Sequence, residues 1–579
     1  NNIVFDNLKK KIVKDKEYFF FTNKTGPLKV EKILEKNIPI ILSSINWKKS
    51  MRWNVFSDRW IRPIKNILCI FEGKKISFDY AGISSENFTF GNYNYGECKI
   101  RINNIANYEK TLRENNVIIS RTERQKIITK EINNFCRKNK LTYVENNNLF
   151  EKVSDSVEFP NVFFAKFQDK YFSLPDFLIK SVMFDKQDYF CFMDKEKLSN
   201  RFAFLSNHKK IKKKRLVDGN ENVLKARFSD AIFFVEEDTK TKLENRLNEL
   251  KEIIFISGAG NLFQRAERIK LITEKISIIL DYKLGELNKY IILSNADLTC
   301  ELVKEFPNLQ GKVGGFYASI ENLPKQISHA FFNQYNLEFN DTSNNTLSYI
   351  LSISQKLDSV VGYFISYKKL SGAGDPFGVR RSVLSIIKLC IDKNINLNFI
   401  ELIDFNLQKF NSQNIKFKLD KSIIIDFFNK RMRVLFNEYG YENALIDSVI
   451  SNKIINPVKN LDNIKSIYNF SKTAEGINFF KAYKRLSSIK EEISMKSVNI
   501  DLFEFDEERL LNKNTIALEK VDNTISFIKD KKLVKITTKN LNNFFDNVKV
   551  NVENKESREN RKQLINKIYR SICKLINLQ

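Results

Sequence analysis

The sequence predicts a multidomain α+β protein, with a mixed α/β N-terminal part followed by mostly α-helical domains. Its 579 residues are 42% hydrophobic and 28% charged, which indicates a globular chain with several hydrophobic cores. Short apolar runs of strand length gather before about residue 205, whereas apolar residues at helical spacing dominate from about residue 220 to Gln579. These patterns place the strands in the first part of the chain and helices in the rest.

Four short segments in the N-terminal part have the composition of strands. They are rich in β-branched and aromatic residues and have the length of ordinary strands. Their sequences are NILCIFEG, KKISFDYAG, NVFFAKF and YFCFMD. Between the second and third of them, RTERQKIITKEINNFCRKNK predicts a helix over residues 121–140.

Two helix faces can be traced in the helical part of the chain. The second ends at a proline, which cannot continue a helix. The first face is formed by Ala266, Ile269, Thr273, Ile276 and Leu280, and the second by Leu298, Leu302 and Phe306 before Pro307.

The segment SGAGDPFGVRR, residues 371–381, predicts the start of another helix. Asp375 can cap a helix with its carboxylate, and Pro376 suits the first helical position. A P-loop ends in Gly-Lys-Ser/Thr and a dinucleotide fingerprint needs G-x-G-x-x-G, so neither is present. Arg380 and Arg381 would lie near the positive end of the helix dipole, where a carboxylate or a phosphate is needed to stabilise them. The predicted buried stripe of this helix is Val379, Val383, Ile386 or Ile387, and Cys390.

The formal net charge of +27 indicates a polyanionic partner such as nucleic acid. The chain is rich in Lys, Asn, Ile and Phe, and an AT-rich genome imposes part of that usage whatever the function. The densest basic run is KKIKKKR at 209–215. It is either a clamp for a nucleic-acid backbone or a solvated loop.

Histidine-based metal chemistry is excluded by composition, because His208 and His329 are the two histidines of the chain and neither lies in a metal-binding motif. The seven cysteines include no C-x-x-C pair, which argues against a zinc ribbon. We therefore expect no bound metal and reduced cysteines.

The compartment is predicted from what the sequence lacks. No apolar run reaches the roughly 18 residues that a membrane span needs, and NNIVFDNLKKK does not form a signal peptide. We expect a cytoplasmic protein that is not exported and does not enter a membrane.

Nine segments together resemble one known family in order, spacing and length. The N-terminal ones are KSMRW at 49–53 with WIRPI at 60–64, VEFPNVFFAKF with SLPDFLI, and KQDYF at 186–190. The later ones are GNENVLKARFSDAIFFVEEDTK at 219–240, NADLTCELVKEFPNLQGKVGGFYA at 295–318, DPFGVRR, and NFFDNVKVNVENKESRENR at 543–561. The chain resembles the beta subunit of the bacterial heterotetrameric glycyl-tRNA synthetase over nearly its whole length.

The resemblance implies a division of labour between two subunits in an alpha2beta2 complex. The alpha subunit would use ATP with Mg to activate glycine, while the beta subunit binds tRNA(Gly) and itself binds no cofactor, holds no metal and contributes no catalytic residue. The chain agrees with this role because it is basic, poor in histidine and without an adenylation motif.

The resemblance also implies a domain order. We expect a mixed α/β region at 1–205, a helical linker region at 206–290, an HD-like helical domain at 291–400, a helical connector at 401–469, and a helical anticodon-binding domain of the arginyl-tRNA synthetase kind at 470–579.

Several positions depart from the family pattern. Gly315 stands where the family usually has an arginine, Lys65 stands where a histidine is common, and Ser354-Gln355 replace an Ala-Asp pair. Because the HD phosphohydrolases need such residues for metal hydrolysis, we expect the HD-like fold without that chemistry. The chain begins at Asn1 without the family's opening segment, so we expect a trimmed protein or a fragment.

The candidate tRNA-contact residues are basic side chains on predicted helices. Arg558 and Arg561 are three residues apart, so on a helix they share a face and could bind one stretch of phosphate backbone. The alternative is that they pair with Glu556 and Glu559 on a solvated surface. The full set is Arg380, Arg381, Lys484, Arg485, Arg558 and Arg561.

Two other functions remain open at this point. One is an RNA-binding scaffold that is not an enzyme and needs no partner subunit, and the other is an HD-type phosphohydrolase.

Overall fold

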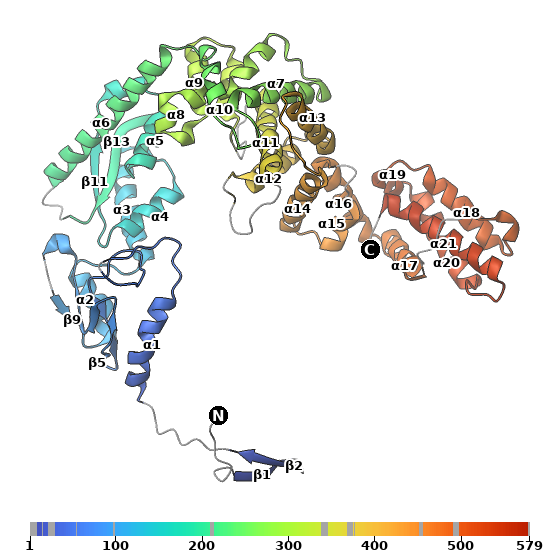
Figure 1. The fold of residues 1–579 in the computed structure, drawn as a ribbon, viewed down its shortest axis with the longest axis horizontal. Helices are drawn as coiled ribbons and strands as arrows, with labels where there is room; N and C mark the ends of the chain where they lie inside the picture. Colours follow the sequence, from blue (N-terminus) through green and yellow to red (C-terminus); the bar gives the residue numbers. More distant parts are fainter. Residues whose placement is uncertain are drawn as a thin grey trace. The chain divides into compact units, whose positions relative to one another are not determined.

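A computed structural model describes most of the chain, and it divides into two compact units, residues 1–232 and 233–579 (Figure 1). The described residues are 9–13, 16–20, 29–53, 55–96, 99–208, 213–336, 345–367, 375, 377–450, 455–489 and 497–576. The long helix α6, Lys213–Thr239, contains the boundary between the units.

The first unit begins with short strands and small sheets. The hairpin β1–β2 is antiparallel, and β3 pairs in parallel with β7. The small core beneath helix α1 contains Ile76, Phe78 and Tyr80. The elements are β1 Lys9–Val13, β2 Lys16–Phe20, α1 Val30–Ser44, β3 Ile67–Leu68, β4 Ile70–Phe71, β5 Lys74–Lys75, β6 Asp79–Tyr80, β7 Ile83–Glu86, β8 Phe88–Phe90, β9 Lys99–Arg101 and α2 Tyr108–Glu114.

A four-stranded antiparallel sheet forms the rest of this unit, in the order β10-β12-β13-β11. Helix α3 packs on it through Ile128 and Ile132, and the Phe135 ring of α3 stacks on Phe164 of β11 at 3.9 Å between centroids. The elements are α3 Arg121–Asn139, β10 Thr142–Tyr143, α4 Asn147–Ser156, β11 Asn161–Lys166, α5 Asp176–Ser181, β12 Phe190–Asp194 and β13 Lys197–Ser206.

The second unit is built from helices in its described residues, arranged around α11. Every residue from Leu347 to Asp358 is buried, so this helix is central to the packing. Helices α7, α12, α13, α14 and α16 add apolar residues to the same core. The elements are α7 Leu262–Ile279, the 3-10 helix η9 Gly285–Thr299, α8 Glu301–Glu305, α9 Lys312–Ile320, α10 Lys325–Asn333, α11 Thr346–Tyr367, α12 Val379–Asp392, α13 Phe399–Ser412, α14 Ser422–Glu438, α15 Asn443–Val449 and α16 Pro457–Ser471.

A separate hydrophobic cluster holds the C-terminal helices together. It runs in sequence from Ile467 to Ile576 and includes Phe479, Phe527 and Phe544. The helices are α17 Ala474–Ile489, α18 Asp506–Glu519, α19 Thr524–Lys529, α20 Lys531–Asn547 and α21 Lys555–Leu575.

The predicted α+β class is confirmed, with the sheets in the first unit and helices dominating the second. The helix predicted at 121–140 is α3. Of the face predicted from Ala266 to Leu280, the first four residues are buried in α7, whereas Leu280 follows the helix and is half-buried. The second predicted helix face is divided, because Leu298 belongs to the 3-10 helix η9 and Leu302 to α8. The five-domain division stays a prediction.

Within the described residues, no helix combines the length and the apolar character that crossing a membrane would require.

Candidate nucleic-acid interface

The start of α12 carries the first two predicted contact residues. Helix α12 begins at Val379, and Gly378, with φ at 64°, precedes it in the left-handed conformation that glycine adopts without strain. The Asp375 carboxylate accepts a hydrogen bond from the backbone amide of Arg380, with Oδ2 at 3.1 Å. The Asp375 carboxylate therefore binds an amide in the first turn, as predicted, but the N-cap residue is Gly378 and the helix begins at Val379, later than predicted. Residues 371–374 and Pro376 lie outside the described residues.

The predicted stripe of α12 is also confirmed, because Val379, Val383, Ile386, Ile387 and Cys390 are all buried. Burial of that face leaves Arg381 exposed and Arg380 half-buried. The helix start therefore presents at least one guanidinium to solvent.

Three aromatic rings pack against one another near the start of α12. Tyr363 stacks on Tyr367 at 5.1 Å, and Phe377 lies 5.5 Å from both. Tyr367 is 47% exposed and Phe377 45% exposed. Burial raises the pKa of Tyr363, and the positive charge of Arg380 acts against that rise. Exposed aromatic rings and an exposed guanidinium on the same segment of chain suit the bases and phosphates of single-stranded RNA.

The second candidate pair lies on α17, where Lys484 and Arg485 are both exposed. Arg485 Nη1 donates to Asp546 Oδ1 at 2.7 Å, and Nη2 donates to the carbonyl oxygen of Phe545 at 3.1 Å. Arg485 thus links α17 to α20 at the surface. Lys484 forms no ion pair with any other described residue, so its charge is open to a ligand.

The third candidate pair is split between surface and interior. Arg558 is half-buried on α21, whereas the side chain of Arg561 is 1% exposed. Arg561 Nη2 donates to Glu504 at 2.7 Å and Nε donates to Glu508 at 2.8 Å. Its Nη1 donates to the carbonyl oxygen of Lys549 at 2.9 Å. The three donors of Arg561 therefore face protein groups.

Glu508 completes this buried cluster. Its Oε2 accepts hydrogen bonds from the backbone amides of Glu504 and Phe505, which directly precede α18, at 2.8 and 2.9 Å. Arg561 thereby ties α21 to the start of α18. Its acidic partners are Glu504 and Glu508, not the Glu556 and Glu559 considered from the sequence.

Ser354 and Gln355 lie in a buried polar network. Gln355 Nε2 donates to Gln334 Oε1 at 2.7 Å and to Asn295 Oδ1 at 3.0 Å, while its own Oε1 accepts from Arg265 at 3.0 Å. The neighbouring Ser354 accepts a hydrogen bond from Thr273 Oγ1 at 3.0 Å. Helices α7, α10 and α11 and the 3-10 helix η9 are joined through these amides.

A buried ion pair lies beside this network. Arg268 and Asp358 are both fully buried, and the guanidinium binds the carboxylate with both arms, Nε to Oδ1 at 2.8 Å and Nη2 to Oδ2 at 3.0 Å. The Arg268 guanidinium also lies over the Phe410 ring at 3.8 Å.

The donor set here does not suit a divalent metal. Asp358 is engaged by Arg268, and the amides around Gln355 are bound to one another, while two guanidinium groups repel a cation. In the part of the chain that the structure describes, no three His, Cys, Asp or Glu side chains converge on a common point.

Two other departures from the family pattern have clear settings. A Cβ added at Gly315 would meet the Ser328 carbonyl oxygen at 2.5 Å and the Phe332 amide nitrogen at 2.7 Å, so α9 and α10 pack backbone to backbone there. Lys65 is exposed in the first unit.

His329 hydrogen-bonds with Ser348 Oγ at 3.2 Å, in a setting of hydroxyl and amide neighbours.

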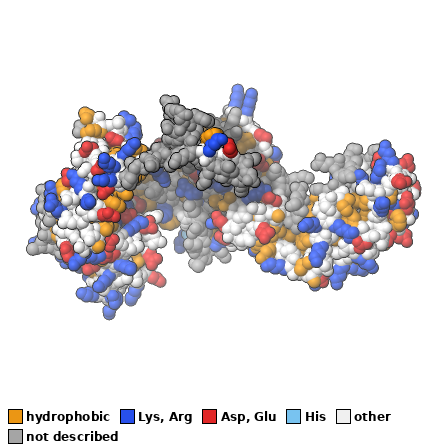
Figure 2. Space-filling view, turned by 90° about the horizontal axis from the view of Figure 1, so that it is seen from below, with side chains coloured by type: hydrophobic (Ala, Val, Ile, Leu, Met, Phe, Trp, Pro, Cys, Tyr) orange, Lys and Arg blue, Asp and Glu red, His pale blue; other side chains and the backbone are white. Residues whose placement is uncertain are grey.

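Basic side chains are spread widely over the surface (Figure 2). In that view the C-terminal helices, on the right, show lysine and arginine side chains with hydrophobic side chains between them. Of the run KKIKKKR, residues 209–212 lie outside the described residues, and Lys213, Lys214 and Arg215 are exposed at the start of α6.

Sequence reasoning missed the buried charges Arg265, Arg268 and Asp358. The available signal was Asp358 within LSISQKLDSVV, where a carboxylate stands between the apolar residues Leu357 and Val360. A buried acid of that kind requires a cationic partner. The arginines of α7 lie about ninety residues away in sequence, so the sequence alone could not assign them to Asp358.

The family model and the relatives that match this chain name the same kind of protein. A family model described as glycyl-tRNA synthetase beta subunit matches residues 1–451. The glycine--tRNA ligase beta subunit of Rickettsia bellii (strain OSU 85-389) is 33% identical over 587 residues, covering 100% of this chain and 86% of the relative. That of Rickettsia prowazekii (strain Madrid E) is 32% identical over 580 residues, covering 98% of this chain and 84% of the relative. The chain therefore belongs to the glycyl-tRNA synthetase beta subunit family.

Proposed function

We propose that this chain is the tRNA-binding, non-adenylating partner of an alpha subunit in a heterotetrameric glycine--tRNA ligase of the cytoplasm. The observation that carries the proposal is the family match, which extends over most of the chain. The alpha subunit binds ATP with Mg²⁺ and forms glycyl adenylate, and this chain binds tRNA(Gly) and presents it for aminoacylation.

The described surface supports a role in RNA binding. Arg381 and Lys484 are exposed, and the charge of Arg380 acts on Tyr363, which packs against the exposed rings of Tyr367 and Phe377. Arg485 and Arg558 reach the surface with part of their side chains. The guanidinium of Arg561 is held by Glu504 and Glu508. Arg561 therefore contributes to RNA binding only indirectly, by fixing α21, the helix that carries Arg558.

A reconstitution experiment tests the division of labour. The isolated chain, given ATP, glycine and tRNA(Gly), should bind the tRNA but catalyse no glycine-dependent pyrophosphate exchange. Addition of the alpha subunit should start both pyrophosphate exchange and glycyl-tRNA formation. Exchange by this chain alone would contradict the proposal, and so would full aminoacylation by the alpha subunit without it.

A further inference from the structure

Helix α1 of the first unit is apolar on two sides, and the described part of the chain covers one of them. Leu34, Ile38 and Leu42 recur every four residues along the helix. They pack on the small core around Phe78 and Tyr80, beside the short strands (Figure 1). This first side attaches α1 to the rest of its unit.

The core under α1 includes tryptophans from two of the segments that resemble the family. Trp53 of KSMRW and Trp60 of WIRPI both pack against it. Met51 and Trp60 also exchange backbone hydrogen bonds at 2.8 and 3.2 Å, which joins the two segments. Helix α1 is therefore held on a built platform.

The second side of α1 is a stripe of exposed aliphatic residues. Val30, Ile33, Ile40 and Ile41 are between 42 and 59% exposed, and steps of three, seven and eight residues keep them on one side of a helix. Ile45 continues the stripe directly after the helix and is also exposed. Among the described residues, no other helix exposes more than two large hydrophobic side chains.

The sequence of α1 does little to stabilise the helix by itself. Five of its fifteen residues are β-branched, and Pro39 lies inside it. The N-cap residue Lys29 makes no side-chain hydrogen bond to the first turn, and no residue of α1 is fully buried. Because helices in proteins depend mainly on packing of an apolar face, α1 needs a second surface to cover its stripe.

Lysines border the stripe on the side away from the core. Lys29, Lys32 and Lys36 are exposed, and helical spacing places them along one edge of the stripe. Glu31 and Glu35 are half-buried and lie on the core side of the helix. A surface that covers the stripe should therefore be apolar at its centre and acidic where it meets these lysines.

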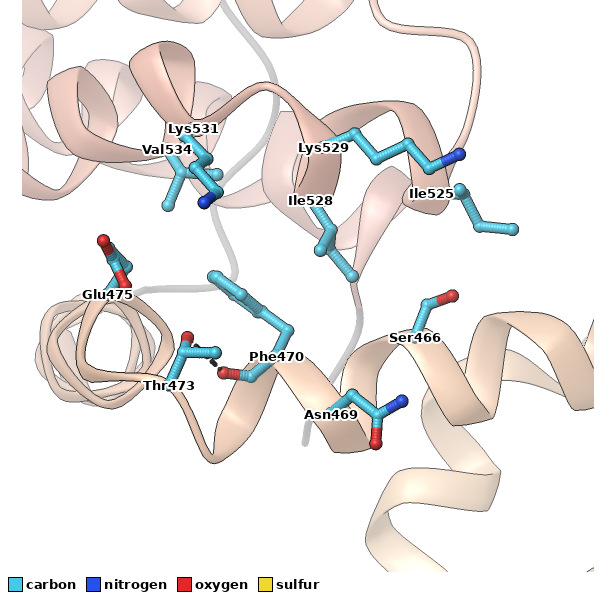
Figure 3. A pocket seen from close by; sticks show the side chains of 10 residues that line it. All are labelled: Ser466, Asn469, Phe470, Thr473, Glu475, Ile525, Ile528, Lys529, Lys531 and Val534. Carbon is cyan, nitrogen blue, oxygen red and sulfur yellow. Dashed lines mark hydrogen bonds between the residues drawn. The ribbon is translucent and has the colours of Figure 1, made fainter.

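The pocket beside Phe470 is less suited to a subunit contact. It opens between the end of α16 and the start of α17 on one side and α19 and the start of α20 on the other, with a volume of about 320 Å³ (Figure 3). A pocket of this size admits a small ligand, and its lining includes both Glu475 and Lys529. The α1 stripe instead runs along a helix about 22 Å long, which suits the binding of a helix in a groove.

We propose that the exposed stripe of α1 is a contact surface for the alpha subunit, which covers it with an apolar groove bordered by acidic side chains. The family supplies this partner, since a beta subunit implies an alpha subunit. Aliphatic side chains give RNA no ring on which to stack. A second copy of this chain would bring the same lysines and another net charge of +27 against the first. The inference rests on the proposed function, because it assumes a complex with an alpha subunit.

The first test measures hydrogen exchange in α1 peptides of the full chain, alone and with the alpha subunit added. Exchange should be fast in the chain alone and about tenfold slower or more in the complex, because the stripe becomes buried. Helix α3 is the control, since it already buries its stripe within this chain and should exchange equally in both states.

Three outcomes of this experiment would overturn the proposal. Slow exchange of α1 in the chain alone at every concentration would show that the chain covers its own stripe. Protection that rises with the concentration of this chain would identify a second copy as the partner. Protection by anionic lipid vesicles, with none from the alpha subunit, would identify a membrane surface.

A double variant tests the stripe by affinity. Ile40→Gln/Ile41→Gln should weaken binding of the alpha subunit about tenfold or more in a titration by calorimetry. Glutamine has a higher helix propensity than isoleucine, so the helix itself is retained. The matched control Ile254→Gln/Ile278→Gln removes two other exposed isoleucines and should bind like the wild-type protein.

The lysine edge is tested separately. Lys32→Glu/Lys36→Glu should weaken binding of the alpha subunit more at low than at high ionic strength, because salt screens the repulsion that the new carboxylates introduce. Equal affinity of this variant and the wild-type protein at low salt would contradict the acidic border.

The affinity results separate the two proposals. If the wild-type chain binds the alpha subunit and Ile40→Gln/Ile41→Gln binds it as tightly as the control does, the stripe proposal is wrong and the proposed function stands. If the wild-type chain does not bind the alpha subunit, the proposed function is wrong and the stripe proposal falls with it.

Discussion

Arg561 differs from the other basic residues considered for RNA binding because its guanidinium is inside the protein. Removing one partner of a buried ion pair leaves the other charge uncompensated, and this cost is about 3–5 kcal/mol. Glu508, which is fully buried, would be left in that state.

We therefore expect Arg561→Met to lower the local opening free energy of α18 and α21 by about 3–5 kcal/mol. The half-buried Arg558 is the matched control, and Arg558→Met on the same helix should change it by less than about 0.5 kcal/mol. Hydrogen exchange with mass spectrometry on peptides from residues 497–576 measures both. Equal protection in the two variants would show that Arg561 does not stabilise this region.

Lys356 is a second residue whose role is set by burial. Its ammonium group donates to the Asn336 carbonyl oxygen at 2.9 Å and to Ser352 Oγ. No carboxylate of the described residues forms an ion pair with it. Burial lowers the pKa of Lys356 from 10.5 to about 7. Above pH 7 the folded protein releases a proton that the unfolded chain keeps up to pH 10.5, so the unfolded state binds more protons in this window.

This difference predicts that Lys356 makes stability rise with pH between about 7 and 10. Relative to Lys356→Met, the opening free energy of α11 in the wild-type protein should increase from pH 7 to 9, by up to about 1.4 kcal/mol per pH unit. Hydrogen exchange corrected for its intrinsic pH dependence gives the two curves. Parallel curves would mean that Lys356 keeps its proton in the folded protein.

At the scale of elements, close helix packing explains the glycine at position 315. A methyl group there would lie 2.5 Å from the Ser328 carbonyl oxygen and 2.7 Å from the Phe332 amide nitrogen, both of which belong to the backbone of α10. The two helices must separate to admit it.

Gly315→Ala should therefore destabilise the α9–α10 pair by about 1–3 kcal/mol. Gly219 on α6 is the control, because it is exposed and a Cβ there meets no atom within 4 Å. Gly219→Ala should stabilise its helix by about 0.5–1 kcal/mol. Hydrogen exchange in each helix measures the change, and a neutral Gly315→Ala would show that α9 and α10 are less tightly packed than described.

The elements that periodicity predicts well are those with one buried face. Helices α3, α7 and α12 each bury one stripe, and the spacing of apolar residues records it. Helix α11 is buried all round, so it has no polar face from which to define a stripe. Strand β13 was missed because Ser199, Asn200 and Arg201 interrupt its apolar pattern.

The candidate site was less predictable than the fold. The spacing of Arg558 and Arg561 places them on neighbouring parts of one helix but does not determine which one faces inward. That depends on Glu504 and Glu508, which are more than fifty residues away in sequence. The pocket beside Phe470 could not be predicted for the same reason, because α16 and α19 are distant in sequence.

For the whole molecule, a net charge of +27 attracts RNA at long range, but only basic groups that touch phosphate set the salt slope. We expect Lys484→Gln/Arg558→Gln to reduce the log-log salt slope for tRNA(Gly) by roughly 1.4 if both residues contact phosphates of a single strand. The control Lys289→Gln/Lys304→Gln removes the same charge from lysines that pair with Glu286 and Glu301, so its slope should equal that of the wild-type protein.

The same two double variants also distinguish tRNA binding from amino-acid activation. With the alpha subunit present, both should support normal glycine-dependent pyrophosphate exchange, because in the proposed division of labour the adenylate forms on the other subunit. Only Lys484→Gln/Arg558→Gln should raise the tRNA concentration needed for half-maximal aminoacylation. Identical slopes for the two variants would show that these residues act through net charge alone, and the phosphate contacts would then lie elsewhere on the chain.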